Sequence, residues 1–570
     1  MTHFIKTQNA FSAGEVSPDF FACSNINGLS KLENMDVTPG GGLSRRKGLE
    51  QIDSIGNNGR LIPFSVDENN NYLLVLTNLR LRIYNGITMV ADMVAPWASA
   101  DLCKIQYAQR SGTMMFVHPL YRPQMLQKVG NSFSLSQYGF SSDENGFINM
   151  PRTRFADSED VKITVSSSTQ GNTYATFTTN RDFWQPANIA TYIFLMGKQW
   201  IITHYISPTQ VTAFLGETFI PPVDPITDWT EAVFSERRGW PASISFYQDR
   251  LVFGGSPSLP STVWMSHVGQ HTNFSAGTGL DDEAIALTLL SQERQQICTI
   301  VSSDNLQILT SVGEWAISSK PLTPSNVDIK QHTSVGSVWA RNLPPQQIEG
   351  RTVFVSANEH DIRELNLDDL TQNYNATDLC AYSKHLLGGV IDIAYNSDTH
   401  QLFVVLNNGT ISVLNYNSSL EIAAWAKYTT AGQFMSVAVV NNETYVIVKR
   451  DSEYTIEKFS SDTLADCNEY EFAYNACSLP LVASGHNADK LHIHKISARI
   501  MNTKSISINA QRITLPNWVY TDDTPGFTGD VSINQLGTSC DYMVPIWRIH
   551  GTESLPITVL SVTTYGRYTI

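Results

Sequence analysis

A short strand pattern that recurs about every 40 residues is the feature that most constrains this fold. Each copy is an apolar run, a turn rich in Asn, Gly, Asp or Pro, and a second alternating run. Tyr72 and Thr113 start two clear copies 41 residues apart, and Leu402 and Thr444 start two more 42 residues apart. Period-two alternation bounded by turn residues predicts strands. No long stretch keeps the apolar stripe of a helix, so the chain is expected to be all-β with few helices.

The length of the repeat distinguishes between the all-β architectures that such strands could form. A repeat of about 40 to 45 residues made of short strands is the spacing of propeller blades. One blade cannot bury both faces of its sheet alone, so neighbouring blades pack around an axis. A row of independent sandwiches would need about 100 residues for each unit. The sequence therefore predicts a β-propeller of about six or seven blades.

Two segments break the repeat and define the expected domains. Residues 151–239 carry their own alternation and end in a proline-rich stretch, which predicts an inserted β-domain. The pattern changes again at the C-terminal end, where residues 478–570 are expected to form a β-sandwich-like platform domain. Residues 1–50 are expected to form an N-terminal arm or part of the platform. The first blades then cover residues 51–150, and the remaining blades cover residues 240–477.

Composition narrows the class of protein. The chain of 570 residues has 53 acidic and 38 basic side chains, a formal net charge of −15. High-affinity binding to nucleic acid depends mainly on Lys and Arg displacing counterions from phosphates, so this acidic chain is a poor candidate for holding DNA. Aromatic residues reach 10 %, which argues against disorder. No apolar run approaches the roughly 18 residues of a membrane span, and the N-terminus does not resemble a secretory signal, so no transmembrane segment is expected.

The cysteines indicate a protein made in a reducing compartment. No C-x-x-C pair occurs, and no cysteine lies near two histidines at the spacing of a zinc site. We therefore expect seven thiols without disulfides. They are Cys23, Cys103, Cys298, Cys380, Cys467, Cys477 and Cys540.

Catalytic and metal-binding motifs are missing or incomplete. The sequence has no nucleophile elbow, no Walker loop and no H-E-x-x-H zinc motif. Residues 67–78 begin like a calcium loop, but they lack the glycine at the sixth position and carry Asn78 where the bidentate glutamate belongs. A hairpin turn is expected there instead. His492 and His494 share one face of a strand, which could suit a metal but is more typical of a solvated face. We predict no catalytic residue, no metal and no cofactor.

Asp281, Asp282 and Glu283 form the most suggestive carboxylate cluster. A glycosidase needs two carboxylates that flank the scissile bond, and some propellers with that activity repeat a Ser-x-Asp-x-Gly turn. Residues 141–146 approach this turn once, without repetition in other blades. A propeller that binds or cleaves a host glycan is therefore the alternative function. A cellular scaffold propeller is disfavoured, because the sequence lacks WD-type signatures.

The first 48 residues have an unusual density of glycine and proline. Such a density predicts an extended, turn-rich arm rather than a packed element. The alternative is an ordinary N-terminal loop with a solvated basic triplet. The residues that stand out are Phe11, Gly14, Glu15, Pro18, Pro39, Gly40, Gly41, Arg45, Arg46 and Lys47.

These residues and a series of later motifs resemble the tail nozzle proteins of short-tailed bacteriophages, often called tail tubular protein B. The later matches follow in the same order along the chain. They are Phe234 and Ser235; Gly239, Trp240 and Pro241; residues 246–255; Trp264 and Ser266; Asn273 and Phe274; Asp281 and Asp282; Gly313, Glu314 and Trp315; residues 331–337; residues 374–379; and Trp425. The C-terminal stretch 558–568 is compatible with the same family.

The resemblance implies a structural virion protein, not an enzyme. Proteins of this family carry a propeller with inserted and platform β-domains, and they assemble as a six-fold ring below the adaptor ring and portal. The bore of the ring forms the distal part of the conduit for genome ejection into the bacterial host. The implied partners are further copies in a homohexamer, the tail adaptor protein, tail fibres or tailspikes, viral double-stranded DNA that passes without specific binding, and indirectly the host outer surface. The implied location is the virion tail, after assembly in the host bacterial cytoplasm.

Two expectations about surfaces follow. The N-terminal motif residues from Phe11 to Arg46 are expected to make interfaces, with the basic triplet contacting the acidic face of a neighbouring subunit or the adaptor. Exported DNA must slide without sticking, so the bore is expected to be lined by Asp, Glu, Asn, Gln, Ser and Thr. Repulsion between an acidic bore and DNA would act at close quarters, because salt screens it beyond about a nanometre.

Overall fold

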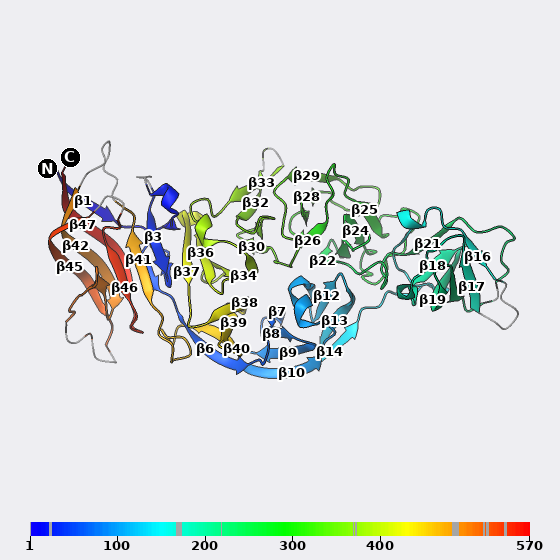
Figure 1. Cartoon of the computed structure of the whole chain (residues 1–570), viewed down its shortest axis with the longest axis horizontal. Coiled ribbons are helices and arrows are strands. Elements are labelled where there is room, and N and C mark those ends of the chain that lie inside the picture. Colours follow the sequence, from blue (N-terminus) through cyan, green and yellow to red (C-terminus); the bar gives the residue numbers. More distant parts are fainter. Residues whose placement is uncertain are drawn as a thin grey trace. The chain divides into compact units, whose positions relative to one another are not determined.

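The computed structural model describes residues 2–21, 26–166, 174–217, 219–368, 370, 373–480, 490–516, 519, 524–540 and 544–569. Strands dominate the described residues (Figure 1), and the helical elements among them are short 3-10 turns. This confirms the expected all-β class. The turns are η1 (Pro18–Phe20), η2 (Ser99–Lys104), η3 (Ala156–Ser158), η4 (Pro186–Asn188), η5 (Lys384–Leu386) and η6 (Ser418–Leu420).

The chain divides into two compact units. The first unit comprises Met1–Cys103 and Leu343–Ile570, and the second unit comprises Lys104–Asn342. Both are built largely from small antiparallel sheets of four strands. The boundaries expected from the sequence stay predictions, and each unit is described by its own sheets.

The second unit contains three four-stranded sheets in which the strands lie side by side in sequence order. This up-and-down order is that of propeller blades. The sheets are β11 (Gln106–Arg110), β12 (Thr113–His118), β13 (Tyr121–Val129) and β14 (Ser132–Gln137); β22 (Ser243–Tyr247), β23 (Arg250–Gly254), β24 (Thr262–Met265) and β25 (Ile285–Thr288); and β26 (Ile297–Ser302), β27 (Leu306–Thr310), β28 (Glu314–Ile317) and β29 (Ile329–Thr333).

A seven-stranded antiparallel sheet interrupts these blades in the second unit, between β14 and β22. Its order is β15-β21-β18-β19-β20-β17-β16. The sheet has its own core, centred on the buried rings of Trp184, Trp200 and Trp229, so it forms an inserted β-domain. Its strands are β15 (Arg152–Thr153), β16 (Ile163–Val165), β17 (Tyr174–Thr179), β18 (Tyr192–Leu195), β19 (Lys198–Ser207), β20 (Gln210–Phe214) and β21 (Trp229–Ala232).

The first unit adds four blades, which brings the described blade sheets to seven. This number agrees with the predicted propeller of about six or seven blades. The strands are β7 (Arg60–Asp67), β8 (Asn70–Thr77), β9 (Arg80–Asn85) and β10 (Thr88–Val94); β30 (Gln346–Ile348), β31 (Arg351–Val355), β32 (Ile362–Asp368) and β33 (Asn373–Asp378); β34 (Val390–Asn396), β35 (Gln401–Leu406), β36 (Ile411–Asn417) and β37 (Ile422–Tyr428); and β38 (Gln433–Val440), β39 (Glu443–Arg450), β40 (Glu453–Ser460) and β6 (Gly48–Ser54).

The last of these blades is completed by a strand from the other end of the chain. Strand β6 pairs antiparallel with β40, so that Leu49 lies opposite Phe459 and Gly48 opposite Ser460. A pairing between residues so distant in sequence ties the N-terminal segment to the final blade.

The other N-terminal strands build the platform together with C-terminal strands. One sheet has the order β4-β5-β47-β42-β45, with β1 also paired to β47, while the sheet of β34 to β37 continues through β2-β3-β41-β46-β43-β44. The strands are β1 (Thr2–Gln8), β2 (Gly14–Glu15), β3 (Gly28–Glu33), β4 (Met35–Val37), β5 (Leu43–Arg45), β41 (Tyr474–Ser478), β42 (Lys490–Thr503), β43 (Ser507–Ile508), β44 (Gln511–Arg512), β45 (Phe527–Cys540), β46 (Arg548–Gly551) and β47 (Thr558–Thr569).

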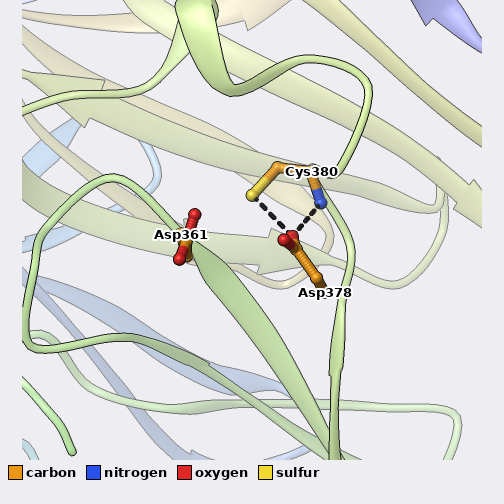
Figure 2. A group of neighbouring side chains, drawn as sticks. All are labelled: Asp361, Asp378 and Cys380. Atoms are coloured by element: carbon orange, nitrogen blue, oxygen red, sulfur yellow. Dashed lines mark hydrogen bonds between the residues drawn. The ribbon is translucent and has the colours of Figure 1, made fainter. Parts of the chain in front are cut away.

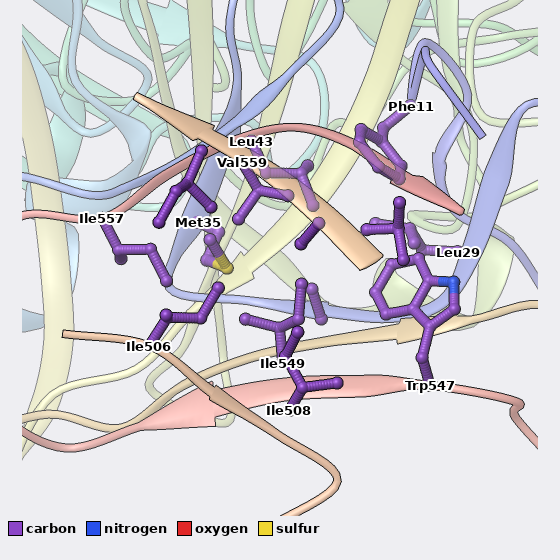
Figure 3. Close-up of a cluster of buried hydrophobic side chains, with 14 of the residues drawn as sticks. Phe11, Leu29, Met35, Leu43, Ile506, Ile508, Trp547, Ile549, Ile557 and Val559 are labelled. Carbon is purple, nitrogen blue, oxygen red and sulfur yellow. The ribbon is translucent and has the colours of Figure 1, made fainter. Parts of the chain in front are cut away.

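Both platform sheets bury apolar side chains in one core (Figure 3). Leu29 and Met35 from the N-terminal strands pack there with Ile549 and Val559 from the C-terminal strands. The expectation of an extended arm is therefore wrong for the described N-terminal residues. Short apolar alternations at residues 28–45 place side chains in this core, and burying each large one fully contributes about 1.5–3 kcal/mol.

Candidate functional site

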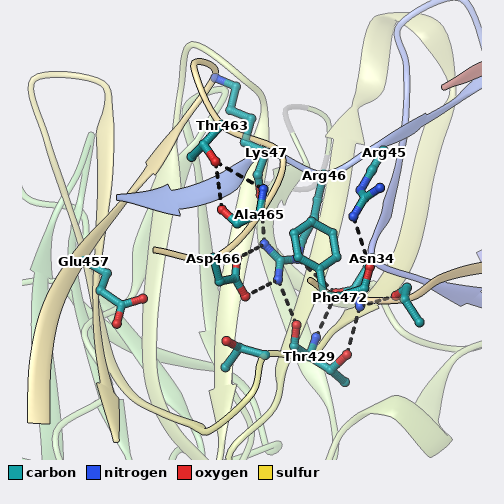
Figure 4. Close-up of polar contacts among 12 residues, drawn as sticks. Asn34, Arg45, Arg46, Lys47, Thr429, Glu457, Thr463, Ala465, Asp466 and Phe472 are labelled. Atoms are coloured by element: carbon teal, nitrogen blue, oxygen red, sulfur yellow. Dashed lines mark hydrogen bonds and ion pairs between the residues drawn. The ribbon is translucent and has the colours of Figure 1, made fainter. Parts of the chain in front are cut away.

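Arg46 is the centre of a buried polar cluster in the first unit (Figure 4). Its Nη1 and Nη2 donate to Oδ1 and Oδ2 of Asp466 at 3.0 and 2.8 Å, and neither side chain is exposed. The remaining guanidinium donors bond Asn34 Oδ1 at 2.9 Å, the Lys47 carbonyl at 2.8 Å and the Thr429 carbonyl at 2.8 Å. A guanidinium has five N–H donors, and here all five have acceptors.

Asn34 extends this cluster to two further segments. Its amide nitrogen donates to Thr429 Oγ1 at 2.8 Å and to the Ala473 carbonyl at 2.6 Å, while its Oδ1 also accepts from the Thr429 amide at 2.9 Å. Asn34 lies between β3 and β4 with φ of 53°, a left-handed conformation that asparagine tolerates better than most residues. The cluster thus joins the N-terminal strands to the β37–β38 connection and to the segment before β41.

Arg45 and Arg46 share one aromatic partner. The guanidinium carbon of Arg46 lies 3.5 Å from the ring centre of Phe472, and that of Arg45 lies 4.4 Å from the same centre. Arg45 also donates to the carbonyls of Phe472 and Glu553, the first at 3.0 Å. Burial lowers the pKa of Arg45 to about 10, so Arg45 remains charged near neutral pH. Cation–π contacts of this kind strengthen when the cation is desolvated.

Gly14 and Glu15 pack the first motif against β37, the last strand of the blade that begins with β34. Gly14 has φ of +62°, and a Cβ atom there would lie 2.4 Å from backbone atoms of Trp425, so only glycine fits. Glu15 is buried, and its carboxylate accepts from the Leu32 amide at 2.7 Å and lies 3.0 Å from Nε2 of His385. Gly14 and Trp425, two residues of the nozzle resemblance, are therefore paired directly.

The predicted interface residues separate into two groups. Phe11, Gly14, Glu15, Gly41, Arg45 and Arg46 are buried within the chain, whereas Pro18, Pro39 and Gly40 are exposed, as is the adjacent Lys47. Arg46 does meet an acidic group, but that group is Asp466 of its own chain. A contact of the exposed residues with a neighbouring subunit or an adaptor stays a prediction.

Sequence reasoning missed the partners of these residues. Asp466, Phe472 and Asn34 stand in no recognisable motif, and each is separated in the sequence from a residue that it contacts. The one local signal is the short polar break between the apolar alternations of β3 and β4, which places Asn34 at a turn.

Asp361, Asp378 and Cys380 form the one group of three potential metal ligands among the described residues (Figure 2). A cationic side chain already pairs with both carboxylates of this group, because Nζ of Lys384 lies 2.8 Å from Asp361 and 3.1 Å from Asp378. Burial opposes ionisation of both carboxyls, but hydrogen bonds and the Lys384 charge outweigh it and lower the pKa of both.

The thiol of this group is poorly suited to a metal. Its Sγ donates to Asp378 Oδ1 at 3.0 Å, and burial and that carboxylate raise the pKa of Cys380 to about 12. A metal ligand must be a thiolate, so the arrangement is that of an ion-pair network. His492 and His494 belong to no group of three such ligands within the described residues.

The sequence predicted thiols without disulfides, and five of the seven cysteines can be compared with that prediction. Cys23 lies outside the described residues, and the side chain of Cys540 is likewise not described. The other five carry free thiols: Cys103, Cys298, Cys380, Cys467 and Cys477.

The carboxylate cluster at Asp281 to Glu283 is part of a loop held by its backbone. Buried Arg250 donates from Nη2 to the Asp281 carbonyl at 2.8 Å and from Nη1 to the Ser266 carbonyl at 2.7 Å. The Glu283 carboxylate accepts from the amides of Gly279 and Leu280 at 2.5 and 2.8 Å. Glu283 therefore closes a turn, and Arg250 joins two stretches of the nozzle resemblance. Residues 67–70 similarly form the turn between β7 and β8, as predicted.

The fold and these contacts define an all-β propeller protein whose buried motif residues serve packing. Residues 242–518 match the family model of the bacteriophage nozzle protein. This match confirms the resemblance to phage tail nozzle proteins found in the sequence. A protein of this family is a structural component of the virion tail and is assembled with other tail proteins.

No curated protein matches the sequence. Three solved structures are similar to this chain: the WD40 repeats of RRP9 (7 % identity, 73 % of this chain and 100 % of that chain, TM-score 0.34), BamB from Moraxella catarrhalis (11 %, 72 % and 98 %, 0.34) and the C-terminal WD40 domain of Sif2 (11 %, 73 % and 99 %, 0.34). TM-scores this low do not establish a shared fold, so the propeller assignment rests on strand order. No helix of the described residues is long and apolar enough to cross a membrane.

The buried ion pair predicts a large loss of stability when one partner is removed. We expect Asp466→Asn to lower the free energy of unfolding of the first unit by about 3–5 kcal/mol, because Arg46 would remain buried without a counter-charge. Urea denaturation measures this change. The matched control is Asp530→Asn, which removes a carboxylate from the exposed pair with Arg499 and should change the free energy of unfolding far less, because solvent screens an exposed pair. Equal effects of the two substitutions would contradict the assignment.

The buried carboxyl group of Asp36 should make the free energy of unfolding depend on pH. Its carboxylate accepts from the Tyr428 hydroxyl and from Gln401 Nε2, and burial raises its pKa from 3.8 to about 6. The folded protein thus binds the proton more tightly than the unfolded chain. The stability that Asp36 contributes is present below pH 3.8 and is lost as the pH rises through about 6.

Asp36→Asn tests this sign. Between pH 4 and pH 7 the wild-type free energy of unfolding should fall relative to that of Asp36→Asn, by about 1–3 kcal/mol. Denaturation curves at both pH values provide the measurement. Parallel pH profiles of the two proteins would show that Asp36 does not titrate in this range.

Proposed function

We propose that this chain is the tail nozzle of a short non-contractile phage tail. Six copies form a ring that closes and extends the channel through which the genome is ejected into the bacterial host. The family match over residues 242–518 carries this proposal. The proposed partners are the tail adaptor above the ring and fibres or tailspikes around it, and assembly takes place in the host cytoplasm before the ring becomes part of the virion.

The charge of the chain supports a conduit that does not hold DNA. With a net charge of −15 for each copy, a ring of copies repels a phosphate backbone at short range, and a bore lined by acidic and neutral polar side chains offers few counterion-displacing contacts. DNA then passes without specific binding. A bore lined by Lys and Arg would contradict this part of the proposal.

An exposed sheet edge in the first unit supports assembly into a ring. Strand β10 is an edge strand of its four-stranded sheet, and Met89, Val90 and Val94 along it are exposed, as is Ile87 just before it. Its one charged residue, Asp92, is paired with Arg80 at 2.8 Å. Monomeric proteins usually protect such edges with charge or proline, and a closed ring needs a head-to-tail interface between copies.

We propose further that the chain is not an enzyme and holds no cofactor. The two carboxylate clusters that could suggest otherwise are engaged in fold contacts, since Asp361 and Asp378 pair with Lys384 and Glu283 closes a turn. The alternative function, a propeller that binds or cleaves a host glycan, predicts released oligosaccharide when the protein is incubated with host lipopolysaccharide. We expect none.

Electron microscopy of the purified protein tests the ring directly. Negative-stain class averages, with and without the adaptor protein, should show a six-fold ring with an open centre, stacked on the adaptor when both are present. Native mass spectrometry gives the copy number independently. Monomers that never form rings, even with the adaptor, would contradict the proposal, whereas a closed ring of another order would correct the copy number alone.

A further inference from the structure

A hollow of about 460 Å³ lies in the second unit, where three blade strands begin. Gln106 starts β11, Ala242 immediately precedes β22, and Ile297 starts β26, and all three line the hollow. The segments 255–260 and 339–342 supply further walls. No sequence motif identified above falls on its charged residues.

The charge of the lining is opposite to that of the chain. Lys104, Arg294 and Arg341 line the hollow, and no Asp or Glu does. Among the described residues, no hydrogen bond or ion pair engages these three side chains. Three positive charges facing one concave surface, in a chain with a net charge of −15, repel one another unless an anion lies between them.

The floor of the hollow is already organised. Gln295 is buried, and its Oε1 accepts from Thr310 Oγ1 and from Trp315 Nε1, both at 3.2 Å. Gln106 Nε2 donates to the Cys298 carbonyl, and Asn342 Nδ2 donates to the Ile105 carbonyl at 2.8 Å. These polar groups are satisfied within the protein, so the cations are the groups left to meet a ligand. A preformed site loses little entropy on binding.

The rim indicates a protein partner. Trp339 is 61 % exposed beside Arg341, and Trp and Arg are the residues that most often dominate the energy of protein interfaces. Arg side chains bind carboxylates in a bidentate manner. A DNA duplex presents a convex, continuous charge that does not enter a hollow of this size, and the acidic chain around it disfavours DNA.

We propose that this hollow docks an acidic peptide segment of a partner protein. Two carboxylates of the segment pair with Arg294 and Arg341, a third anionic group faces Lys104, and Trp339 covers the bound backbone. The inference rests on the proposed function only for the existence of tail partners, because charge complementarity alone carries the chemistry of the site.

Fluorescence anisotropy with a fluorescein-labelled hexaglutamate peptide tests the site on the full-length protein. We expect saturable binding at low salt, and at least a tenfold weaker affinity for Arg294→Ala/Arg341→Ala, because two charge-assisted hydrogen-bonding groups are lost. Trp339→Ala should also weaken binding. The matched control Lys162→Ala/Lys320→Ala removes two exposed cations of the same unit from outside the hollow, and it should bind like the wild type. A labelled hexaglutamine peptide should not bind.

Several outcomes would overturn the proposal. They are the absence of hexaglutamate binding to the wild type, equal affinity in the Arg294→Ala/Arg341→Ala variant with an unchanged melting temperature, and tighter binding of a labelled DNA duplex that depends on the same arginines. Negative-stain images of the same samples separate this inference from the proposed function. If the protein forms rings but does not bind hexaglutamate, only the docking site is refuted. If it binds hexaglutamate through the arginines but stays monomeric, only the ring is refuted.

Discussion

The buried ion pair of Arg46 and Asp466 is the contact on which the first unit depends. It lies where the N-terminal strands, the last two blades and the platform meet, and every donor of the guanidinium is used. Removing a charge from water is costly unless its partner and hydrogen bonds are all in place. The pair therefore favours a single arrangement of these segments. Phe472, stacked on both Arg45 and Arg46, keeps water away from it.

The same arrangement explains how one chain closes its own sheets. Strand β6 completes the blade of β38 to β40, and β5 and β1 pair with β47. Both platform sheets thus combine strands from the two ends of the chain. Sheets closed by pairings distant in sequence cannot be opened from one end of the chain only. The exposed edge of β10 and the cationic hollow of the second unit are, by contrast, surfaces suited to partners.

The blades could be predicted from the sequence because each contains one strand that is buried on both faces. The four clear copies at Tyr72, Thr113, Leu402 and Thr444 fall on β8, β12, β35 and β39, the second strand of each blade, whose residues are almost all buried. The N-terminal strands were not predictable in this way. They are short, and their partners lie hundreds of residues away. Their dense glycines and prolines therefore predicted an extended, turn-rich arm. Asp466 and the three cations of the hollow carry no local signal, because only the fold brings them to their sites.

Hydrogen exchange of the intact protein tests most directly whether the N-terminal strands are an integral part of the packed fold. We expect amides of β6 to exchange as slowly as those of β38 to β40, and amides of β3 as slowly as those of β34 to β37, since each strand shares hydrogen bonds with the sheet to which it belongs. Protection of β3 should also be lost together with that of β41, its antiparallel partner. Exchange of β3 and β6 within seconds, while the other strands of their sheets stay protected, would contradict this packing and favour the extended arm.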